Sequence, residues 1–443
     1  MLVGTPGVVQ FSTVGSERSR GGIVMNGVYY VVSGTTLFSI DELGTVSNLG
    51  TVTGTVRVVM AHNGEKLCIV VPGGNGYVYN RTTAVFVQIT DADYRTADTV
   101  CFKDGYYIFT ATAGDVFFIS ALNDPLTFDP LDFGTAELSP DKIIGCHIDH
   151  DELFIFGSET TEVFQNVGGS GFPFQRIPGA SSEKGLRSKY GLAQWESAFY
   201  FVGGGVNERT SIFRSSGTSE PIKISTNAVD FKIQEFTSQE IARAFTFTFS
   251  ISGTSFVGFT FNSVNIPDRT FVFNVTASTL TGQHVWHEQQ TGIQESGWRV
   301  ASLDFVYDKL LVSDLMDGRV GYLDANVYTE YGETILREKV TGPFSADGRS
   351  IYVGALELTV DSGQGTSSGQ GVDPLVMLDF SDDGARNFSS NTNRSMGKIG
   401  EYRRRVEWRR LGRVPAHRVW RLRVSDPVRV AFIKLEGRGT FGR

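Results

Sequence analysis

A turn followed by an aromatic or aliphatic run recurs along most of this chain, and it constrains the fold more than any other feature of the sequence. Clear copies begin at Met25, His62, Lys103 and Asp149, each with a short polar turn before an apolar run. Weaker copies occupy residues 195–201, 251–257 and 306–312. The interval between copies is roughly 40 to 55 residues, which is close to the period of four-stranded propeller blades.

Each unit continues with a second strand that returns after another turn, as at residues 76–79, 115–119 and 318–323. One such sheet cannot bury both of its faces, whereas radially stacked sheets cover one another and leave few edges exposed. We therefore predict an all-β fold with a β-propeller of six or seven blades over residues 15–340. Residues 1–14 are expected to form an N-terminal arm or closing strand. A pair of β-sandwiches is the alternative arrangement of the same strands.

Three of the turns carry a dipeptide that readily adopts the positive φ values of a tight hairpin. They are Asn26-Gly27, Asn63-Gly64 and Asp104-Gly105, and we expect them to be equivalent. The composition agrees, because 51 Gly, 33 Phe and 15 Tyr against 6 Met are typical of many short strands and tight turns. Long amphipathic helices are not expected.

Neither a membrane span nor an export signal is expected. No apolar run approaches the roughly 20 residues that a membrane helix needs. The first residues lack the basic start and the long apolar segment of a secretory signal, which favours assembly in a cytoplasm. Cys68, Cys101 and Cys146 are odd in number and lie in strand-like runs, which favours buried small hydrophobes over disulfides or metal ligands.

The repeat fades after Val340, and we predict a smaller C-terminal β domain over residues 341–443. Residues 361–371 are rich in Gly and Ser and are expected to form a flexible loop. From Gly384 to Arg443 the chain carries 14 Arg and 2 Lys against four acidic residues, a local formal charge of +12. The remaining 383 residues then carry −20, since the whole chain carries −8. Such asymmetry indicates that the two parts meet different partners.

The basic end alternates apolar residues with Arg at period two, so one strand face can pack while the other presents guanidinium groups. Arginine suits an acidic protein or a phosphate, because its planar fork binds two oxygens at once. A protein interface, a solvated face and direct DNA contact are three interpretations of this pattern. The working hypothesis is a partner interface made by Arg403, Arg404, Arg405, Arg409, Arg410, Arg413, Arg418, Arg421 and Arg423.

The sequence predicts no catalytic, cofactor-binding or metal site. Residues 147–151, His-Ile-Asp-His-Asp, occupy a hairpin-turn position, so we interpret them as an ordinary polar turn. His284 and His287 are three residues apart in an expected strand, which places them on opposite faces. Neither a nucleophile elbow nor a phosphate-binding glycine loop occurs in the sequence.

Residues 381–388, Ser-Asp-Asp-Gly-Ala-Arg-Asn-Phe, resemble the Asp-box turn of sialidase-like propellers. In those families the box stabilises a hairpin and is not the catalytic centre. A glycosidase also needs paired carboxylates at a defined separation. We therefore expect no enzyme activity, and we keep a glycan-binding or depolymerising propeller as the alternative function.

Several segments together carry a family resemblance. They are Leu138-Ser-Pro-Asp-Lys-Ile-Ile, residues 152–164, Phe172-Pro-Phe-Gln-Arg-Ile-Pro-Gly-Ala, Met396-Gly-Lys-Ile-Gly-Glu-Tyr-Arg and residues 408–413. In combination they resemble the packaged-DNA stabilisation proteins of short-tailed bacteriophages, which are tail hub or nozzle proteins. The resemblance spans most of the chain. It departs at residues 184–187, Lys-Gly-Leu-Arg, where relatives tend to have a Gly-Cys segment.

The resemblance implies a structural protein of the virion tail. Such proteins form a six-fold ring below the portal and its adaptor ring, retain the packaged genome and pass it during ejection. The implied partners are copies of the chain itself, the tail adaptor ring, tail fibre, spike or needle proteins, and double-stranded DNA that crosses the lumen without sequence-specific binding. An acidic lumen would repel a duplex evenly, whereas arginines in the lumen would grip it. The sequence leaves open which surface lines the channel.

Overall fold

The computed structural model describes residues 2–169, 171–345 and 349–442. Its strands gather into two compact units. Residues 10–290 and 295–322 form the first, the propeller unit, and residues 2–9, 291–294 and 323–442 form the second, the sandwich unit. Among the described helices, none is long and apolar enough to cross a membrane.

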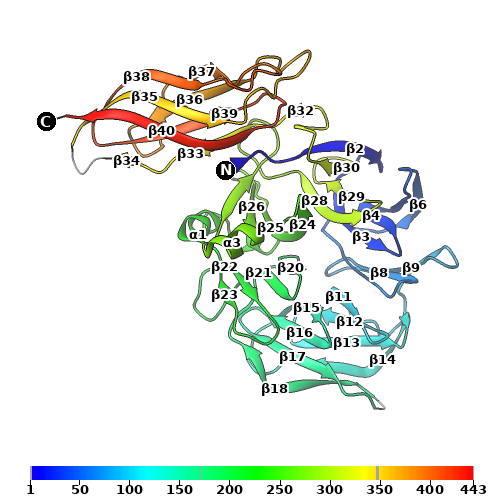
Figure 1. The fold of residues 1–443 in the computed structure, drawn as a ribbon. Helices are drawn as coiled ribbons and strands as arrows, with labels where there is room; N and C mark the ends of the chain where they lie inside the picture. Colours follow the sequence, from blue (N-terminus) through cyan, green and yellow to red (C-terminus); the bar gives the residue numbers. More distant parts are fainter. Residues whose placement is uncertain (1, 170, 346–348, 443) are drawn as a thin grey trace. The chain divides into compact units, whose positions relative to one another are not determined.

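The first six blades of the propeller unit are antiparallel sheets that follow one another in chain order (Figure 1). Blades 1 and 2 hold β3 (Ser19–Met25), β4 (Val28–Ser33), β5 (Thr36–Ile40), β6 (Val46–Thr51), β7 (Val59–His62), β8 (Lys66–Val70), β9 (Gly76–Asn80) and β10 (Val85–Gln88). Blades 3 and 4 hold β11 (Ala97–Lys103), β12 (Tyr106–Ala111), β13 (Val116–Ala121), β14 (Asp124–Thr135), β15 (Ile143–Asp149), β16 (Glu152–Gly157), β17 (Thr161–Asn166) and β18 (Phe174–Ser182). Blades 5 and 6 hold β19 (Gly185–Leu186), β20 (Leu192–Trp195), β21 (Ala198–Gly204), β22 (Ser211–Ser215), β23 (Ile222–Lys223), β24 (Phe245–Ile251), β25 (Thr254–Phe261), β26 (Arg269–Asn274) and β27 (Trp286–Gln289).

Blade 7 joins the two ends of the propeller unit. It contains β28 (Val300–Val306), β29 (Lys309–Asp314), β30 (Arg319–Asp324) and the N-terminal strand β2 (Gly7–Thr13). The Val14 amide donates to the Gly318 carbonyl at 2.7 Å, which fastens the end of β2 to the start of β30. A closed circle of blades leaves only short, protected edges. The predicted β-propeller is confirmed, with seven blades among the described residues.

The helices are short and lie within blades or between them. They are α1 (Asn227–Ile233), α2 (Ser238–Ile241) and α3 (Val275–Thr281). The side chain of Thr237 accepts from the Glu240 amide and the Glu240 carboxylate accepts from the Thr237 amide, so α2 begins with a capping box. Such short helices depend on packing and capping, since an isolated helix of this length is not stable in water.

Aromatic side chains fill the space between neighbouring blades. Phe109 and Phe118 of blade 3 stack with ring centroids 5.2 Å apart and pack against blade 2 in one apolar cluster. Phe154 of blade 4 meets Phe199 of blade 5 edge to face at 4.9 Å. Full burial of one such ring contributes about 1.5–3 kcal/mol. The strands were recognisable in the sequence because these rings recur in every blade.

Two of the predicted hairpin turns have the expected geometry. Asn26 and Gly27 have φ of 47° and 73°, and the flanking residues Met25 and Val28 pair across the hairpin. Asp104 and Gly105 have φ of 52° and 88°. Both central residues therefore lie in the left-handed region that a tight two-residue hairpin requires.

The prediction for the third turn is wrong by one residue. Asn63 is not a central residue there, because its amide bonds to the Lys66 carbonyl at 3.3 Å and the turn is made by Gly64 (φ 92°) and Glu65. The Asn63 side chain accepts from the amides of Glu65 and Lys66 at 2.9 and 2.7 Å. An asparagine that bonds its own downstream backbone precedes the bend, which shifts the turn.

The sandwich unit contains two antiparallel sheets around one core. The first has the order β1 (Leu2–Val3), β40 (Ala431–Phe441), β35 (Ile351–Val360) and β38 (Val406–Val414). The second contains β33 (Arg337–Val340), β34 (Phe344–Ser345), β39 (His417–Val424), β36 (Leu375–Ser381) and β37 (Thr392–Ser395). Leu356 and Trp408 from the first sheet pack with Leu378 and Trp420 from the second. The short strands β31 (Thr329–Glu330) and β32 (Glu333–Thr334) pair with each other before this sandwich begins.

Two features of the sandwich unit bear on what the sequence predicted for it. The pairing between β33 and β39 begins at Arg337, before the expected start at 341. Residues 361–371 contain no strand, but the Thr366 amide bonds to the Gly371 carbonyl at 2.9 Å. Ser362 and Gly371 are also buried. The flexibility of this loop stays a prediction.

Candidate functional site

Arg418 is buried and belongs to the interior of the sandwich unit. Its residue is 3% exposed, and its Nε and Nη2 donate to the two carboxylate oxygens of Asp382 at 2.6 and 2.7 Å. Its remaining donors reach the carbonyls of Leu411 and Arg413 at 2.8 and 3.0 Å. The guanidinium also lies 3.8 Å from the centre of the Phe380 ring. Every direction of this guanidinium is therefore occupied within the chain.

Arg421 and Arg423 share the buried carboxylate of Asp379. Arg421 binds both oxygens at 2.9 Å and Arg423 binds one at 2.7 Å, while Asp379 is 1% exposed. Asp379 and Arg421 are cross-strand partners on β36 and β39. The hydrogen bonds that Arg421 donates to Asp379 raise the pKa of Arg421. Removing one member of such a buried pair typically costs about 3–5 kcal/mol, so these two arginines stabilise the fold.

Three further arginines, Arg405, Arg409 and Arg413, are exposed, and each bonds to a neighbouring side chain. Arg405 binds both oxygens of Glu357 at 2.8 Å. Arg409 pairs with Glu407 at 2.8 Å, and Arg413 donates to the Ser350 hydroxyl at 2.9 and 2.7 Å. The arginines lower the pKa values of both glutamates. Surface pairs of this kind contribute little stability, so their main effect is to orient the guanidinium groups.

Arg403, Arg404 and Arg410 are exposed, and no ion pair joins them to another residue in the described part of the chain. Arg410 has φ of 59° and lies in a bulge of β38, where the pairing with β35 shifts between Val353 and Ala355. A bulge re-aims side chains and disrupts strand pairing. The structure thus divides the nine predicted interface arginines into three internal, three oriented and three unpaired residues.

The Asp-box segment forms a compact turn between β36 and β37. Ser381 Oγ lies 2.6 Å from Asp383 Oδ1, and that oxygen also accepts from the amides of Arg386 and Asn387 at 2.9 and 3.0 Å. These hydrogen bonds hold the pKa of Asp383 well below its usual range. Because Asp382 of the same turn anchors Arg418, the box positions the basic strand β39.

The polar turn expected at residues 147–151 is smaller than predicted. His150 is at the turn with φ of 52°, but His147 lies in β15 with Nε2 3.3 Å from Gln194 Oε1. Gln194 also donates to Asp149 Oδ1 at 2.7 Å. Burial lowers the pKa of His147. Within residues 2–169, 171–345 and 349–442 there is no group of three or more side chains that could hold a metal ion.

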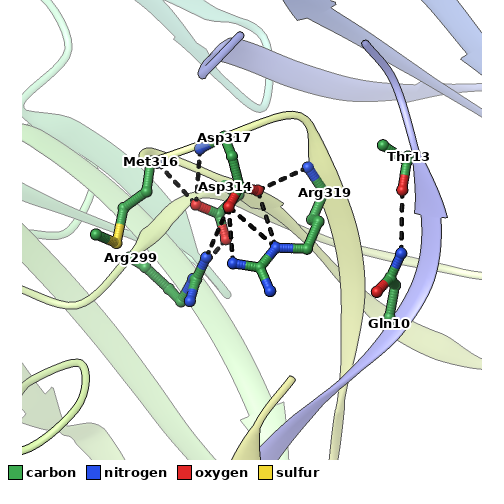
Figure 2. A network of polar contacts seen from close by, with 7 residues as sticks. All are labelled: Gln10, Thr13, Arg299, Asp314, Met316, Asp317 and Arg319. Carbon is green, nitrogen blue, oxygen red and sulfur yellow. Dashed lines mark hydrogen bonds and ion pairs between the residues drawn. The ribbon is translucent and has the colours of Figure 1, made fainter. Parts of the chain in front are cut away.

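A buried ion-pair network fixes the loop between β29 and β30 in blade 7 (Figure 2). Arg299 Nε donates to Asp314 Oδ2 at 2.5 Å, and Asp317 bridges Arg299 at 3.3 Å and Arg319 at 2.7 Å. Burial raises the pKa of Asp314, whereas the bonds from Arg319 lower that of Asp317. Figure 2 shows this network beside β2. The network therefore supports β30, the strand with which β2 pairs.

The inner strands of the propeller unit line an open cavity of about 470 Å³. Its polar lining includes Arg57, Lys189, Tyr190 and Gln194. Cys146 also lines it and is half-buried, unlike the fully buried Cys68, so the expectation of a buried cysteine holds less well at this position. No sequence pattern indicates this cavity, because its lining residues are spread over six blades.

The propeller and the sandwich define a β protein of two compact units. Two family models match the chain: "Bacteriophage P22 Gp10, beta-propeller" over residues 1–328 and "Bacteriophage P22 Gp10, beta-sandwich" over residues 337–439. The chain therefore belongs to the phage P22 Gp10 family of tail stabilisation proteins, which are structural components of the virion tail. This confirms the family resemblance and the propeller with a smaller β domain.

Other comparisons show only distant likeness. No curated protein sequence matches the chain. Similar solved structures include the computationally designed protein Ika8, with 12% identity, a TM-score of 0.41 and coverage of 71% of this chain and 99% of that one. A chain of the mitotic checkpoint complex has 10% identity, a TM-score of 0.42 and coverage of 72% and 92%. PorZ of Porphyromonas gingivalis has 10% identity, a TM-score of 0.41 and coverage of 89% and 46%.

Proposed function

We propose that this chain forms the nozzle ring of a short-tailed phage, a six-fold ring below the tail adaptor that retains packaged DNA and lets it pass during ejection. The membership of a phage tail family supports this role. The observation that carries the proposal is the set of exposed arginines Arg403, Arg404, Arg405, Arg409, Arg410 and Arg413 in a chain whose first 383 residues are strongly acidic.

The outer face of the first sandwich sheet has charges in rows. Arg409 and Arg438 flank Ala355 across three strands. In the next row along the strands, Glu407 and Glu436 flank Glu357. A partner surface must place its charges in complementary rows, and like charges set opposite each other would cost several kcal/mol. The rows therefore favour one register of docking over others.

Protein contact fits these arginines better than single-stranded nucleic acid does. Trp408 and Trp420, the tryptophans of the basic strands, are 1% and 4% exposed. Binding of single strands relies on exposed aromatic rings that stack with bases. Arg418, Arg421 and Arg423 are occupied by Asp382 and Asp379, as described above.

A ring also needs a heterologous interface whose two sides differ. The charge distribution provides two different sides, because the basic residues are concentrated after Gly384 while the rest of the chain carries −20. Opposite charge accelerates encounter and sets orientation. We propose that the exposed arginines join each subunit to an acidic surface of a neighbouring copy or of the adaptor ring. The DNA duplex would cross the lumen without base-specific contacts.

The test is a double charge reversal, Arg404→Glu with Arg410→Glu. Both residues are exposed and unpaired in the described part of the chain, so the melting temperature is expected to stay unchanged while assembly into rings and adaptor-bound tails is lost. The matched control is Arg18→Glu with Arg243→Glu, which makes the same charge change on exposed residues of the propeller unit. Equal assembly of both double variants, at low and at raised salt, would refute the interface.

A further inference from the structure

The cavity of the propeller unit contains a guanidinium with spare hydrogen-bonding capacity. Arg57 lines the cavity, and its Nη2 donates to the Ala301 carbonyl at 2.5 Å. The group also lies over the Phe245 ring, with Cζ 4.1 Å from the ring centre. An arginine has five N–H donors. Only this one bond engages the Arg57 side chain among the described residues, so its other donors remain available to the cavity.

The charge of Arg57 is not neutralised by direct contact with a carboxylate. No Asp or Glu lies within 4.0 Å of its guanidinium in the described part of the chain. Burial lowers the pKa of Arg57 to about 10, so the group still carries its charge at neutral pH. An isolated buried charge is costly unless an opposite charge or polar group solvates it.

The remaining lining does not oppose an anion. Lys189 is the second cationic residue of the lining. Its Nζ lies 2.8 Å from Oδ2 of Asp98, which does not line the cavity. His62 and His147 line the cavity too, and burial lowers the pKa of each. The described lining contains neither Asp nor Glu. Nothing in the lining would therefore repel a negative ligand.

The Arg57 side chain is held in a fixed orientation. Phe245 supports one face of its guanidinium plane, and the Tyr190 hydroxyl donates to the Arg57 carbonyl at 3.0 Å. A guanidinium that is already ordered loses little entropy when it binds a second group. The cavity volume of about 470 Å³ lies within the range of small-molecule sites.

We propose that this cavity is a binding site for a small oxyanion, a carboxylate or phosphate group, which Arg57 holds with its free N–H groups. This inference is independent of the nozzle role, because it concerns the interior of one propeller. Asp304 is the acidic residue whose charge opposes anion binding. Its carboxylate interacts with the charge of Arg57 but does not line the cavity. A bound oxyanion would supply the neutralising charge at closer range.

The test is calorimetric titration of the purified chain with sodium phosphate and, separately, with sodium acetate, at constant ionic strength set by chloride. Millimolar binding of at least one of the two is expected, since a single charge-assisted pair in a preformed cavity gives weak but saturable affinity. The two titrations distinguish a phosphate from a carboxylate ligand. No saturable binding of either anion would overturn the proposal.

Arg57→Gln is expected to weaken binding by about tenfold or more, because it removes the charge and the fork. The matched control is Arg95→Gln. Arg95 makes the same two kinds of contact outside the cavity, with the Pro130 carbonyl at 3.3 Å and with the Phe133 ring at 4.5 Å. Its replacement should leave anion binding unchanged. Equal loss in both variants would show that the anion binds the surface and would overturn the site.

A second variant acts in the opposite direction and does not remove the cavity arginine. Asp304→Asn takes away the negative charge that competes for Arg57, so anion binding should become roughly threefold tighter or more. Unchanged or weaker binding in this variant, with the melting curve intact, would contradict the assignment of Arg57 as the anion ligand. This measurement keeps the proposal testable even if Arg57→Gln fails to fold.

Discussion

Replacing Asp304 by Asn should stabilise the propeller at neutral pH and have no effect in acid. Asp304 lies on β28, and its Oδ2 is buried without a hydrogen-bond partner among the described residues. Burial raises the pKa of Asp304 from 3.8 to about 6, although the charge of Arg57 and a hydrogen bond from Ser302 act in the opposite direction. The folded protein therefore prefers the neutral carboxyl group.

The size of the expected stabilisation follows from this shift in the pKa of Asp304. One pKa unit corresponds to about 1.4 kcal/mol, so the change from 3.8 to about 6 amounts to about 3 kcal/mol. Between these two pH values the folded chain holds a proton that the unfolded chain has released. The free energy of unfolding therefore falls as pH rises through this window, and the loss is complete above about pH 6. Asn resembles the neutral form and avoids the loss.

The assay is urea unfolding of the wild-type chain and of Asp304→Asn at a series of pH values. The variant should be more stable by up to about 3 kcal/mol near pH 7.5, and the difference should vanish near pH 4. Asp308→Asn is the control, because Asp308 is an exposed residue of the adjacent turn. A difference between wild type and Asp304→Asn that is constant with pH, or that grows toward acid, would refute the reasoning.

The remaining predictions concern the turns and the two kinds of arginine. Gly105→Val should destabilise the chain by about 1–3 kcal/mol, because Gly105 has φ of 88° and an added Cβ would lie 2.6 Å from Leu122 Cδ1; a neutral urea midpoint would contradict the turn. Arg418→Ala should cost about 1–3 kcal/mol, because it removes the buried guanidinium that bonds Asp382 and the carbonyls of Leu411 and Arg413. Arg404→Ala should change stability by no more than about 0.5 kcal/mol in the same melting assay, and equal losses in the two variants would contradict their assignment as internal and exposed.

The blades could be predicted from sequence because their signals are local. A hairpin turn and its two strands lie within about a dozen residues, and the strand residues alternate with period two. The turn at Asn63 was misplaced because asparagine can be the residue before a bend or a residue within it. The choice depends on whether its side chain accepts from the following amides, as it does from Glu65 and Lys66.

The roles of the arginines could not be separated in the same way, because their partners are distant in sequence. Arg418 and its partner Asp382 are 36 residues apart, and Arg423 and Asp379 are 44 apart. Arg57 meets the Ala301 carbonyl over 244 residues. Period two predicts that alternate residues share a face, but it does not state which face packs or which acid is buried against it.

Cryo-electron microscopy of the purified ring or of the virion tail is the most direct test that the exposed arginines form a subunit interface in a closed tail ring. We expect a ring in which Arg403, Arg404 and Arg410 are buried against an acidic surface of a neighbouring copy or of the adaptor. We also expect Arg418 to keep its contact with Asp382 in the assembled state. A ring in which Arg403, Arg404 and Arg410 all face solvent or line the DNA channel would contradict the claim.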